Sequence, residues 1–241
     1  MKEKAVLILS GGMDSSVLLY DLLPDWDLQV LTFDYGQKHK REIKCAIKTC
    51  KILGLNHKVI NLHNINPLLQ GSCLTSEQVK VPEGHFSDDS MKATVVPNRN
   101  MIMLSLAIGY SESLNLNKVF IGNHTGDRAQ YPDCRIEFIQ ALSEASKLAT
   151  YNHVEIISPF NNLTKAEIVS IGIVDKVPFK NTWSCYRGET RPCSKCGTDV
   201  ERTEAFYENK IKDPLLTKKE WKIAVEYMQK VREEFKRGLV E

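Results

Sequence analysis

Apolar runs alternate with amphipathic segments along the first two thirds of the chain. Ala5 to Leu9 is an uninterrupted apolar run, which is typical of a strand covered on both faces of a parallel sheet. A glycine-containing turn and the apolar segment Val17 to Leu23 follow, which predicts strand, loop and helix in that order. Further strands are predicted at Leu28 to Phe33, His57 to Leu62, Val119 to Gly122 and Val154 to Ser158, and further helices at about Lys38 to Leu53, Asn100 to Leu114 and Ile136 to Leu148.

This alternation predicts a doubly wound, mostly parallel α/β sheet. Ligands of such sheets bind at the carboxyl ends of the strands. We expect residues 1–180 to form the main domain and residues 181–241 to form a cysteine-rich loop and a helical appendage packed on the same core.

Two segments depart from the alternation. Between His63 and Val95 the chain is polar and contains proline and glycine, and it is too long for an ordinary connection, so we interpret it as a functional flap or a partly mobile loop. Near the C-terminus, Thr217 and Glu220 have the spacing of a capping box. Apolar residues on one face of the following helix predict that it packs on the core or on a second subunit: Trp221, Val225, Met228, Val231 and Phe235.

Composition excludes several classes of function. The 241 residues include 32 Lys plus Arg and 30 Asp plus Glu, so the charge balance gives no footprint for direct nucleic-acid binding. No apolar run approaches the roughly 18 residues that a membrane span needs, and no secretion signal is evident. A cytoplasmic protein without a membrane partner is therefore expected.

The first strand runs directly into the sequence Ser10-Gly-Gly-Met-Asp-Ser15. Backbone N–H groups of such a turn, together with the helix dipole behind it, form an anion site. Gly11 and Gly12 permit the turn, Ser10 and Ser15 add hydroxyl groups, and Asp14 is predicted to cap the helix and to help bind Mg²⁺. The loop lacks the Gly-Lys-Ser/Thr ending of a Walker loop and the spaced glycines of a dinucleotide fingerprint.

Three of the seven cysteines cluster near the end of the chain, at Cys185, Cys193 and Cys196. In a reducing compartment this grouping favours a metal site over disulfides.

The Ser10 to Ser15 loop resembles that of the PP-loop ATP pyrophosphatases, which cleave ATP between the α and β phosphates to adenylate a substrate. Five further segments are together similar to the 7-cyano-7-deazaguanine synthases of the queuosine pathway: Phe33-Asp-Tyr-Gly-Gln37, Val96-Pro-Asn-Arg-Asn100, Tyr131-Pro-Asp-Cys-Arg135, Leu163-Thr-Lys-Ala-Glu-Ile168 and Thr182-Trp-Ser-Cys185. Asn98 stands where many members of that family carry glycine.

That resemblance implies adenylation of the carboxylate of 7-carboxy-7-deazaguanine, displacement of AMP by ammonia to give the amide, and dehydration of the amide to the nitrile with a second ATP. No glutaminase-like region is visible, so ammonia would come from solution. The resemblance also implies ATP with Mg²⁺ as cofactor, a structural Zn²⁺, and a homodimer.

The resemblance assigns roles to residues of this sequence. Lys165, Arg99 and Asp14 are the expected catalytic residues, with Lys165 at a predicted helix start that is unfavourable for a cation unless it has a function. Tyr35 and Gln37 are expected to bind the nucleotide together with the phosphate loop. The expected deazaguanine-binding residues are Asn100, His124, Asp127, Tyr131, Asp133 and Arg135.

The metal ligands depart from the family pattern, because Asp199 stands where the fourth zinc cysteine is expected. Three outcomes stay open: zinc with Asp199 as ligand, zinc with three sulfurs and an open or borrowed position, or free thiols without metal. A remodelled loop here also leaves the acceptor open. The alternatives are a specialised, defence-associated relative that passes the acyl group to a protein amine, and a non-catalytic nucleotide-binding relative.

Overall fold

A five-stranded parallel sheet forms the centre of the molecule, with the strand order β3-β2-β1-β4-β5. The computed structural model describes residues 2–76 and 78–238. The strands are β1 (Glu3–Ile8), β2 (Trp26–Asp34), β3 (Asn56–Asn61), β4 (Lys118–Phe120) and β5 (Glu155–Ile157). All five predicted strands are confirmed, and the doubly wound α/β class is confirmed with them.

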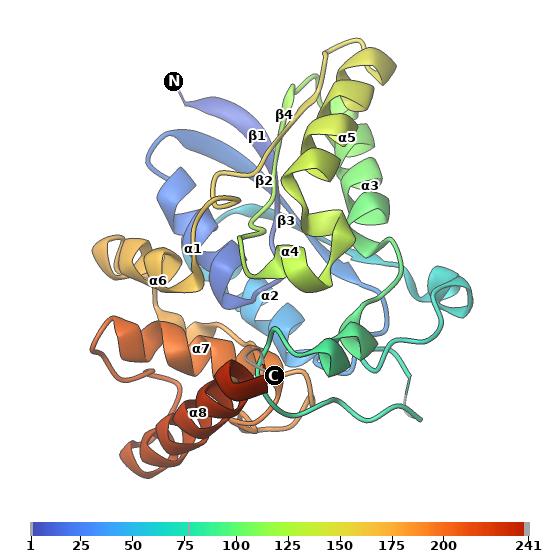
Figure 1. The fold of residues 1–241 in the computed structure, drawn as a ribbon. Helices are drawn as coiled ribbons and strands as arrows, with labels where there is room; N and C mark the ends of the chain where they lie inside the picture. The colour runs from blue at the N-terminus through green and yellow to red at the C-terminus, as the bar shows by residue number, and fades with distance from the viewer. Residues whose placement is uncertain (1, 77, 239–241) are drawn as a thin grey trace.

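The helices of the sheet are α1 (Met13–Leu22), α2 (Arg41–Leu53), α3 (Arg99–Ser113), α5 (Ile136–Ala149) and α6 (Lys165–Val174), and α4 (Asp127–Gln130) is a single turn. Side chains alternate along β1, so that Leu7 faces one layer of helices and Val6 the other. Leu7 belongs to a core that includes α1, α2 and α6, whereas Val6 belongs to a core that includes α3 and α5. Figure 1 shows α3 and α5 on one side of the sheet and α1 and α6 on the other.

The start of α3 explains one residue of the sequence. Asn98 precedes the helix with a φ of 55°, in the left-handed region that glycine and asparagine tolerate best. This backbone requirement accounts for an asparagine at position 98.

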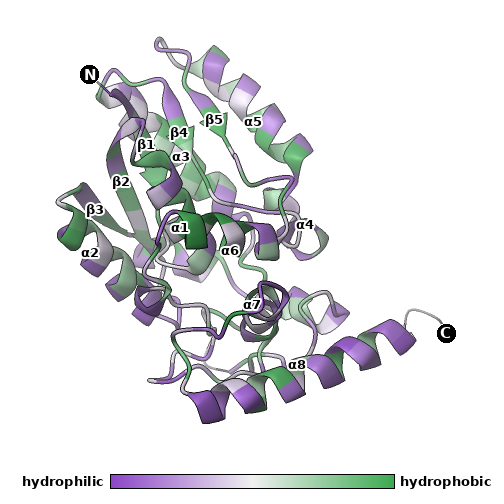
Figure 2. Cartoon of the chain, turned by 90° about the vertical axis from the view of Figure 1, so that its left-hand side faces the viewer, coloured by the Kyte–Doolittle hydropathy of each residue, from purple (hydrophilic) through white to green (hydrophobic). Residues whose placement is uncertain are grey.

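The C-terminal segment adds two helices, α7 (Gly197–Glu208) and α8 (Lys218–Gly238). The capping box is confirmed, since Thr217 N–H donates to Glu220 at 2.7 Å and Glu220 N–H donates to Thr217 at 3.3 Å. Met228 and Val231 of α8 bury against Val200 of α7, so the apolar face packs within the chain. Figure 2 shows α8 running along the end of the molecule away from the sheet, with α7 between them.

The long segment after β3 has more structure than its composition suggests. It contains two short 3₁₀ helices, η1 (His63–Leu68) and η2 (Asp89–Thr94), and it buries Cys73 and Leu74 in the core shared with α3. A further 3₁₀ turn, η3 (Pro132–Cys134), precedes α5, and η4 (Phe179–Asn181) follows α6. Among the described residues, no helix is both long enough and apolar enough to cross a membrane.

Candidate active site

The strand order reverses between β1 and β4, and the loops that follow these two strands lie at that point. The loop after β1 needs its first glycine. Gly11 has a φ of 91°, and a Cβ atom there would lie 2.1 Å from the carbonyl oxygen of Glu42. Any other residue would therefore clash with α2.

The hydroxyl groups of the loop face each other. Ser10 Oγ lies 3.0 Å from Ser15 Oγ and accepts a hydrogen bond from Gly12 N–H at 3.0 Å. The prediction that Asp14 caps the helix is wrong: Gly12 occupies the cap position, and no side chain makes a cap hydrogen bond. The helix begins one residue before Asp14, which leaves the carboxylate free to face a lysine.

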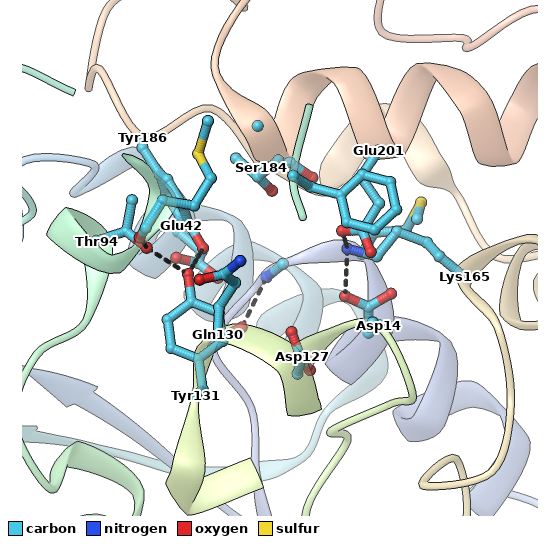
Figure 3. Close-up of a pocket in the computed structure, with 18 of the residues that line it drawn as sticks. Asp14, Glu42, Thr94, Asp127, Gln130, Tyr131, Lys165, Ser184, Tyr186 and Glu201 are labelled. Atoms are coloured by element: carbon cyan, nitrogen blue, oxygen red, sulfur yellow. Dashed lines mark hydrogen bonds and ion pairs between the residues drawn. The ribbon is translucent and has the colours of Figure 1, made fainter. Parts of the chain in front are cut away.

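That lysine is Lys165, the first residue of α6 (Figure 3). Its ammonium lies 3.4 Å from Asp14 Oδ2 and hydrogen-bonds Glu201 of α7. Burial lowers the pKa of Lys165, but the carboxylates of Asp14 and Glu201 outweigh it and raise that pKa well above its ordinary value. For Asp14, burial works against ionisation, but Lys165 and His124 hold the pKa below its usual range. Both groups are therefore charged at neutral pH.

His124 is buried beside this pair. Its Nδ1 accepts a hydrogen bond from Gly126 N–H at 3.1 Å, which places the ring proton on Nε2 in the neutral form. Nε2 lies 3.6 Å from Asp127, 3.8 Å from Glu201 and 3.9 Å from Asp14. Three carboxylates thus surround one imidazole and one ammonium.

This arrangement fits a divalent cation that accompanies a nucleotide. Asp14 Oδ1 is buried and has no hydrogen-bond partner in the described part of the chain. Buried carboxylate oxygens rarely lack a partner, so this oxygen is available to a ligand. Oxygen ligands of this kind suit Mg²⁺, which would also take phosphate oxygens. Asp14 and Asp127 are the residues that would hold it.

Two cavities meet at the phosphate loop and share part of their walls, including Ser10, Asp14, Asp127 and Tyr131. The lysine cavity is lined by Lys165 and Glu201 and extends to Thr94, Gln130, Ser184 and Tyr186. The arginine cavity is lined by Arg99 and extends to the ends of β1 and β2, at Ile8, Phe33, Tyr35 and Gln37. Met103 of α3 and Ile121 after β4 add apolar side chains to it.

Aromatic hydroxyl groups join the two cavities. Tyr131 Oη lies 2.7 Å from Thr94 Oγ1 and 3.2 Å from Tyr186 Oη. Arg99 donates a hydrogen bond to Tyr35 Oη at 3.3 Å, and its guanidinium lies 6.0 Å from the centre of the Tyr131 ring. Burial opposes the charge of Arg99, but Tyr35 and Cys134 help to raise its pKa well above its ordinary value. A buried, permanently charged guanidinium suits an anionic ligand.

The structure brings most of the expected residues to these walls, and four lie elsewhere. Gly11 and His124 line neither cavity. Asp133 instead accepts a hydrogen bond from Asn100 N–H at 2.7 Å, at the start of α3, and Arg135 donates to the carbonyl of Arg128 at 3.3 Å. Asp133 therefore has a structural partner already.

Several wall residues were not expected from the sequence. Glu201 lies on α7, far along the chain, and no local pattern marks it. Glu42 reaches the loop from α2, and Tyr186 directly follows the Thr182-Trp-Ser-Cys185 segment. The position of Tyr186 directly after this segment is the one signal that could have identified it.

Next to the lysine cavity, the side chains of Cys185, Cys193, Cys196 and Asp199 converge. Their ligand atoms all lie within 4.8 Å of one another, and the four residues together could hold a metal ion. Backbone N–H groups donate to the sulfurs, from Cys193 to Cys185 at 3.3 Å and from Cys196 to Cys193 at 3.3 Å. Burial, together with the Cys193 sulfur, raises the pKa of Asp199 to about 7. Three sulfurs, two of which accept N–H bonds, and a buried carboxylate fit a tetrahedral zinc site.

A parallel α/β sheet with this loop after its first strand is a fold of the PP-loop ATP pyrophosphatase type. Comparison with known proteins narrows the class. The family of Queuosine biosynthesis protein QueC matches residues 4–210, and the chain belongs to that family.

Similar proteins cover nearly the whole chain. The 7-cyano-7-deazaguanine synthase of Pseudoalteromonas translucida (strain TAC 125) is 48% identical over 216 residues, which cover 89% of this chain and 99% of the relative. That of Archaeoglobus fulgidus is 46% identical over 231 residues, covering 95% and 96%. Among solved structures, the NMN synthetase from Francisella tularensis is 15% identical with a TM-score of 0.47, covering 97% of this chain and 85% of that one.

Proposed function

We propose that the protein is an ATP-dependent ligase that adenylates the carboxylate of 7-carboxy-7-deazaguanine and converts it, with ammonia, to 7-cyano-7-deazaguanine. The observation that carries this proposal is the meeting of two cavities at one phosphate loop, in a chain about half identical to proteins named 7-cyano-7-deazaguanine synthase. One cavity serves the nucleotide and the other the acid, with their reacting atoms at the shared wall.

The arginine cavity suits the nucleoside. Its floor of Ile8, Phe33 and Ile121 is apolar and offers contact to a flat base, while Gln37 and Tyr35 lie along the same wall. The triphosphate then extends over Ser10 and Ser15 toward the N-terminus of α1. Asn100, assigned to the deazaguanine from sequence, falls on this nucleotide side.

The lysine cavity suits the deazaguanine acid. Gln130, Tyr131 and Ser184 supply hydrogen-bonding groups for the polar edge of a purine-like ring, and Asp127 lies on the wall shared with the nucleotide. In-line displacement would require a carboxylate in this cavity to approach the α-phosphate from the side opposite the leaving pyrophosphate. Lys165 is placed to stabilise the charge that develops on the phosphate oxygens.

In the first step of the proposed reaction, the carboxylate oxygen attacks the α-phosphate and pyrophosphate leaves. Ammonia then attacks the acyl carbon, and AMP leaves with the former carboxylate oxygen to give the amide. A second ATP adenylates the amide oxygen with release of a second pyrophosphate, and loss of AMP and protons gives the nitrile. Mg²⁺ held by Asp14 and Asp127 would neutralise phosphate charge.

Isotope exchange between ATP and labelled pyrophosphate tests the first step. We expect exchange that depends on added 7-carboxy-7-deazaguanine, because adenylation is reversible while the adenylate stays bound. The same assay with guanine in place of the acid is the control. Exchange without the acid would contradict the acid as the adenylated group, and no exchange with it would contradict adenylation and favour a non-catalytic nucleotide-binding protein.

A further inference from the structure

Lys165 occupies a position that is electrostatically unfavourable by itself. It is the first residue of α6, where the positive end of the helix dipole disfavours a cation, and its side chain is only 10% exposed. A buried ammonium at such a place needs carboxylate partners. Its two partners, Asp14 and Glu201, come from opposite sides of the cavity (Figure 3).

The two partners are not equivalent. Asp14 belongs to the phosphate loop, has one buried oxygen without a partner, and is the residue that a magnesium ion would engage. Glu201 makes the direct hydrogen bond to Lys165, and its other oxygen lies 3.8 Å from His124 Nε2. With a cation bound to Asp14, Glu201 would be the carboxylate partner left to hold the ammonium in place.

The helix that carries Glu201 is fixed at its start by the cysteine cluster. Cys196 occupies the N-cap of α7 and Asp199 lies in its first turn. Glu201 follows two residues later, so the cluster sets where that carboxylate stands.

The next residue, Arg202, ties the same turn to the phosphate loop. Its buried guanidinium donates to Asp213 at 2.6 Å and to Thr182 at 2.8 Å. Trp183, the neighbour of Thr182, donates its backbone N–H to the carbonyl of Gly11 at 3.1 Å. The first two turns of α7 thus contact the phosphate site through two separate routes.

We infer that Glu201 is a positioning residue, which holds the Lys165 ammonium at the phosphate site and through which the cysteine cluster of α7 supports adenylation. The effect of Glu201 on the reaction rate rests on the proposed function, whereas its effect on the reactivity of the Lys165 amine rests on the ion pair alone. Glu201 acts through Lys165 and need not contact the substrate.

A double-mutant cycle of Glu201→Gln and Lys165→Met measures this coupling in acid-dependent ATP–pyrophosphate exchange. Glu201→Gln should lower the rate about 10- to 100-fold, with the KM for ATP unchanged or lower, since displacement of a catalytic group carries costs of this order. In the Lys165→Met background the same substitution should change the rate less than about threefold, because residues that act as a unit are non-additive. Glu208→Gln, two turns along α7 and paired with Arg232 at 3.6 Å, is the matched control and should retain the wild-type rate.

A second measurement needs no turnover. Labelling of Lys165 by an amine-reactive ester, followed by mass spectrometry, should increase in Glu201→Gln and not in Glu208→Gln, because loss of the carboxylate frees the amine. Melting temperature and metal content separate this effect from unfolding and should match those of wild type. Equal rate losses in both backgrounds, or unchanged labelling, would overturn the inference. Failure of exchange in the wild type with increased labelling in Glu201→Gln would remove the proposed function and leave the positioning role in place.

Discussion

At the scale of single residues, charge balance governs the site. Three carboxylates, those of Asp14, Asp127 and Glu201, surround His124 and face one ammonium, that of Lys165. A polyanion such as ATP would be repelled by this excess of negative charge unless a divalent cation accompanied it. The site is thus arranged for a metal–nucleotide complex.

Asp14→Asn tests the role of that carboxylate. We expect the Mg²⁺ concentration needed for half-maximal exchange to rise on the order of tenfold, because a neutral amide is a weaker ligand for a hard cation. A magnesium titration of exchange at fixed ATP measures it. Asp21→Asn, on an exposed position of the same helix, should behave as wild type. An unchanged magnesium requirement in Asp14→Asn would show that the cation is held elsewhere.

Some site residues could be predicted from the sequence and others could not, depending on how far along the chain their contact partners lie. Gly11 follows from a local turn, and Lys165 from its position at the start of a helix, so both are visible in sequence. Glu201 meets Lys165 across 36 positions, and Glu42 meets the loop only because α2 packs against it. Such contacts depend on how elements pack, which no local pattern records.

At the scale of elements, four of the five strands bury apolar side chains, which makes the alternation of strands and helices visible in the sequence. The edge strand β3 has no buried residue and is visible mainly through its place in that alternation. The boundaries shift by a few residues, and the predicted start of α2 near Lys38 moves to Arg41. The helix α7 was not predicted. Its sequence is mostly polar, and several of its buried side chains are themselves polar or charged, such as Arg202 and Thr203. The buried face of the helix therefore does not appear as a periodic apolar pattern in the sequence.

The start of α8 provides a stability test. Glu220 accepts from Thr217 N–H at 2.7 Å and from Arg191 Nε at 2.9 Å, and Arg191 and Thr217 lower its pKa from 4.5 to about 2. A depressed carboxylate pKa contributes stability that is full above the ordinary value and is lost as the pH falls through the folded one. Thr217→Ala should lower the free energy of unfolding by about 1 kcal/mol through the lost cap.

Urea unfolding of wild type and Glu220→Gln from pH 6 to pH 3 measures the pH dependence. The difference between them should be largest above pH 4.5 and should shrink as the pH falls toward 2. Lys222→Gln, further along the exposed face of α8, is the control and should show no such trend. A difference that stays constant over this range would contradict the role of the ionised Glu220.

At the scale of the whole molecule, the C-terminal segment is held to the sheet through α7, which packs on α6 and carries α8. The cysteine cluster lies at the start of this segment, next to Trp183. The division of the chain at residue 180 and the homodimer stay predictions, the latter open to light scattering in solution.

Replacement of the fourth ligand tests the metal assignment. Asp199→Cys restores four thiolates, and we expect slower release of zinc to a chelator, because soft sulfur ligands hold zinc in closed structural sites. Cys193→Ser should lose zinc and melt at a lower temperature. Zinc content by elemental analysis and release followed with a chromogenic chelator are the measurements. Wild-type protein without zinc, and no gain in Asp199→Cys, would contradict the assignment.

The most direct test of the proposed reaction is product analysis by mass spectrometry after incubation with ATP, Mg²⁺ and 7-carboxy-7-deazaguanine, with and without ammonia. We predict pyrophosphate and an enzyme-bound acyl-adenylate without ammonia, and AMP with 7-cyano-7-deazaguanine formed through the amide when ammonia is present. Unchanged ATP and acid would contradict adenylation itself, and an acyl group attached to a protein amine in place of the nitrile would contradict ammonia as the acceptor.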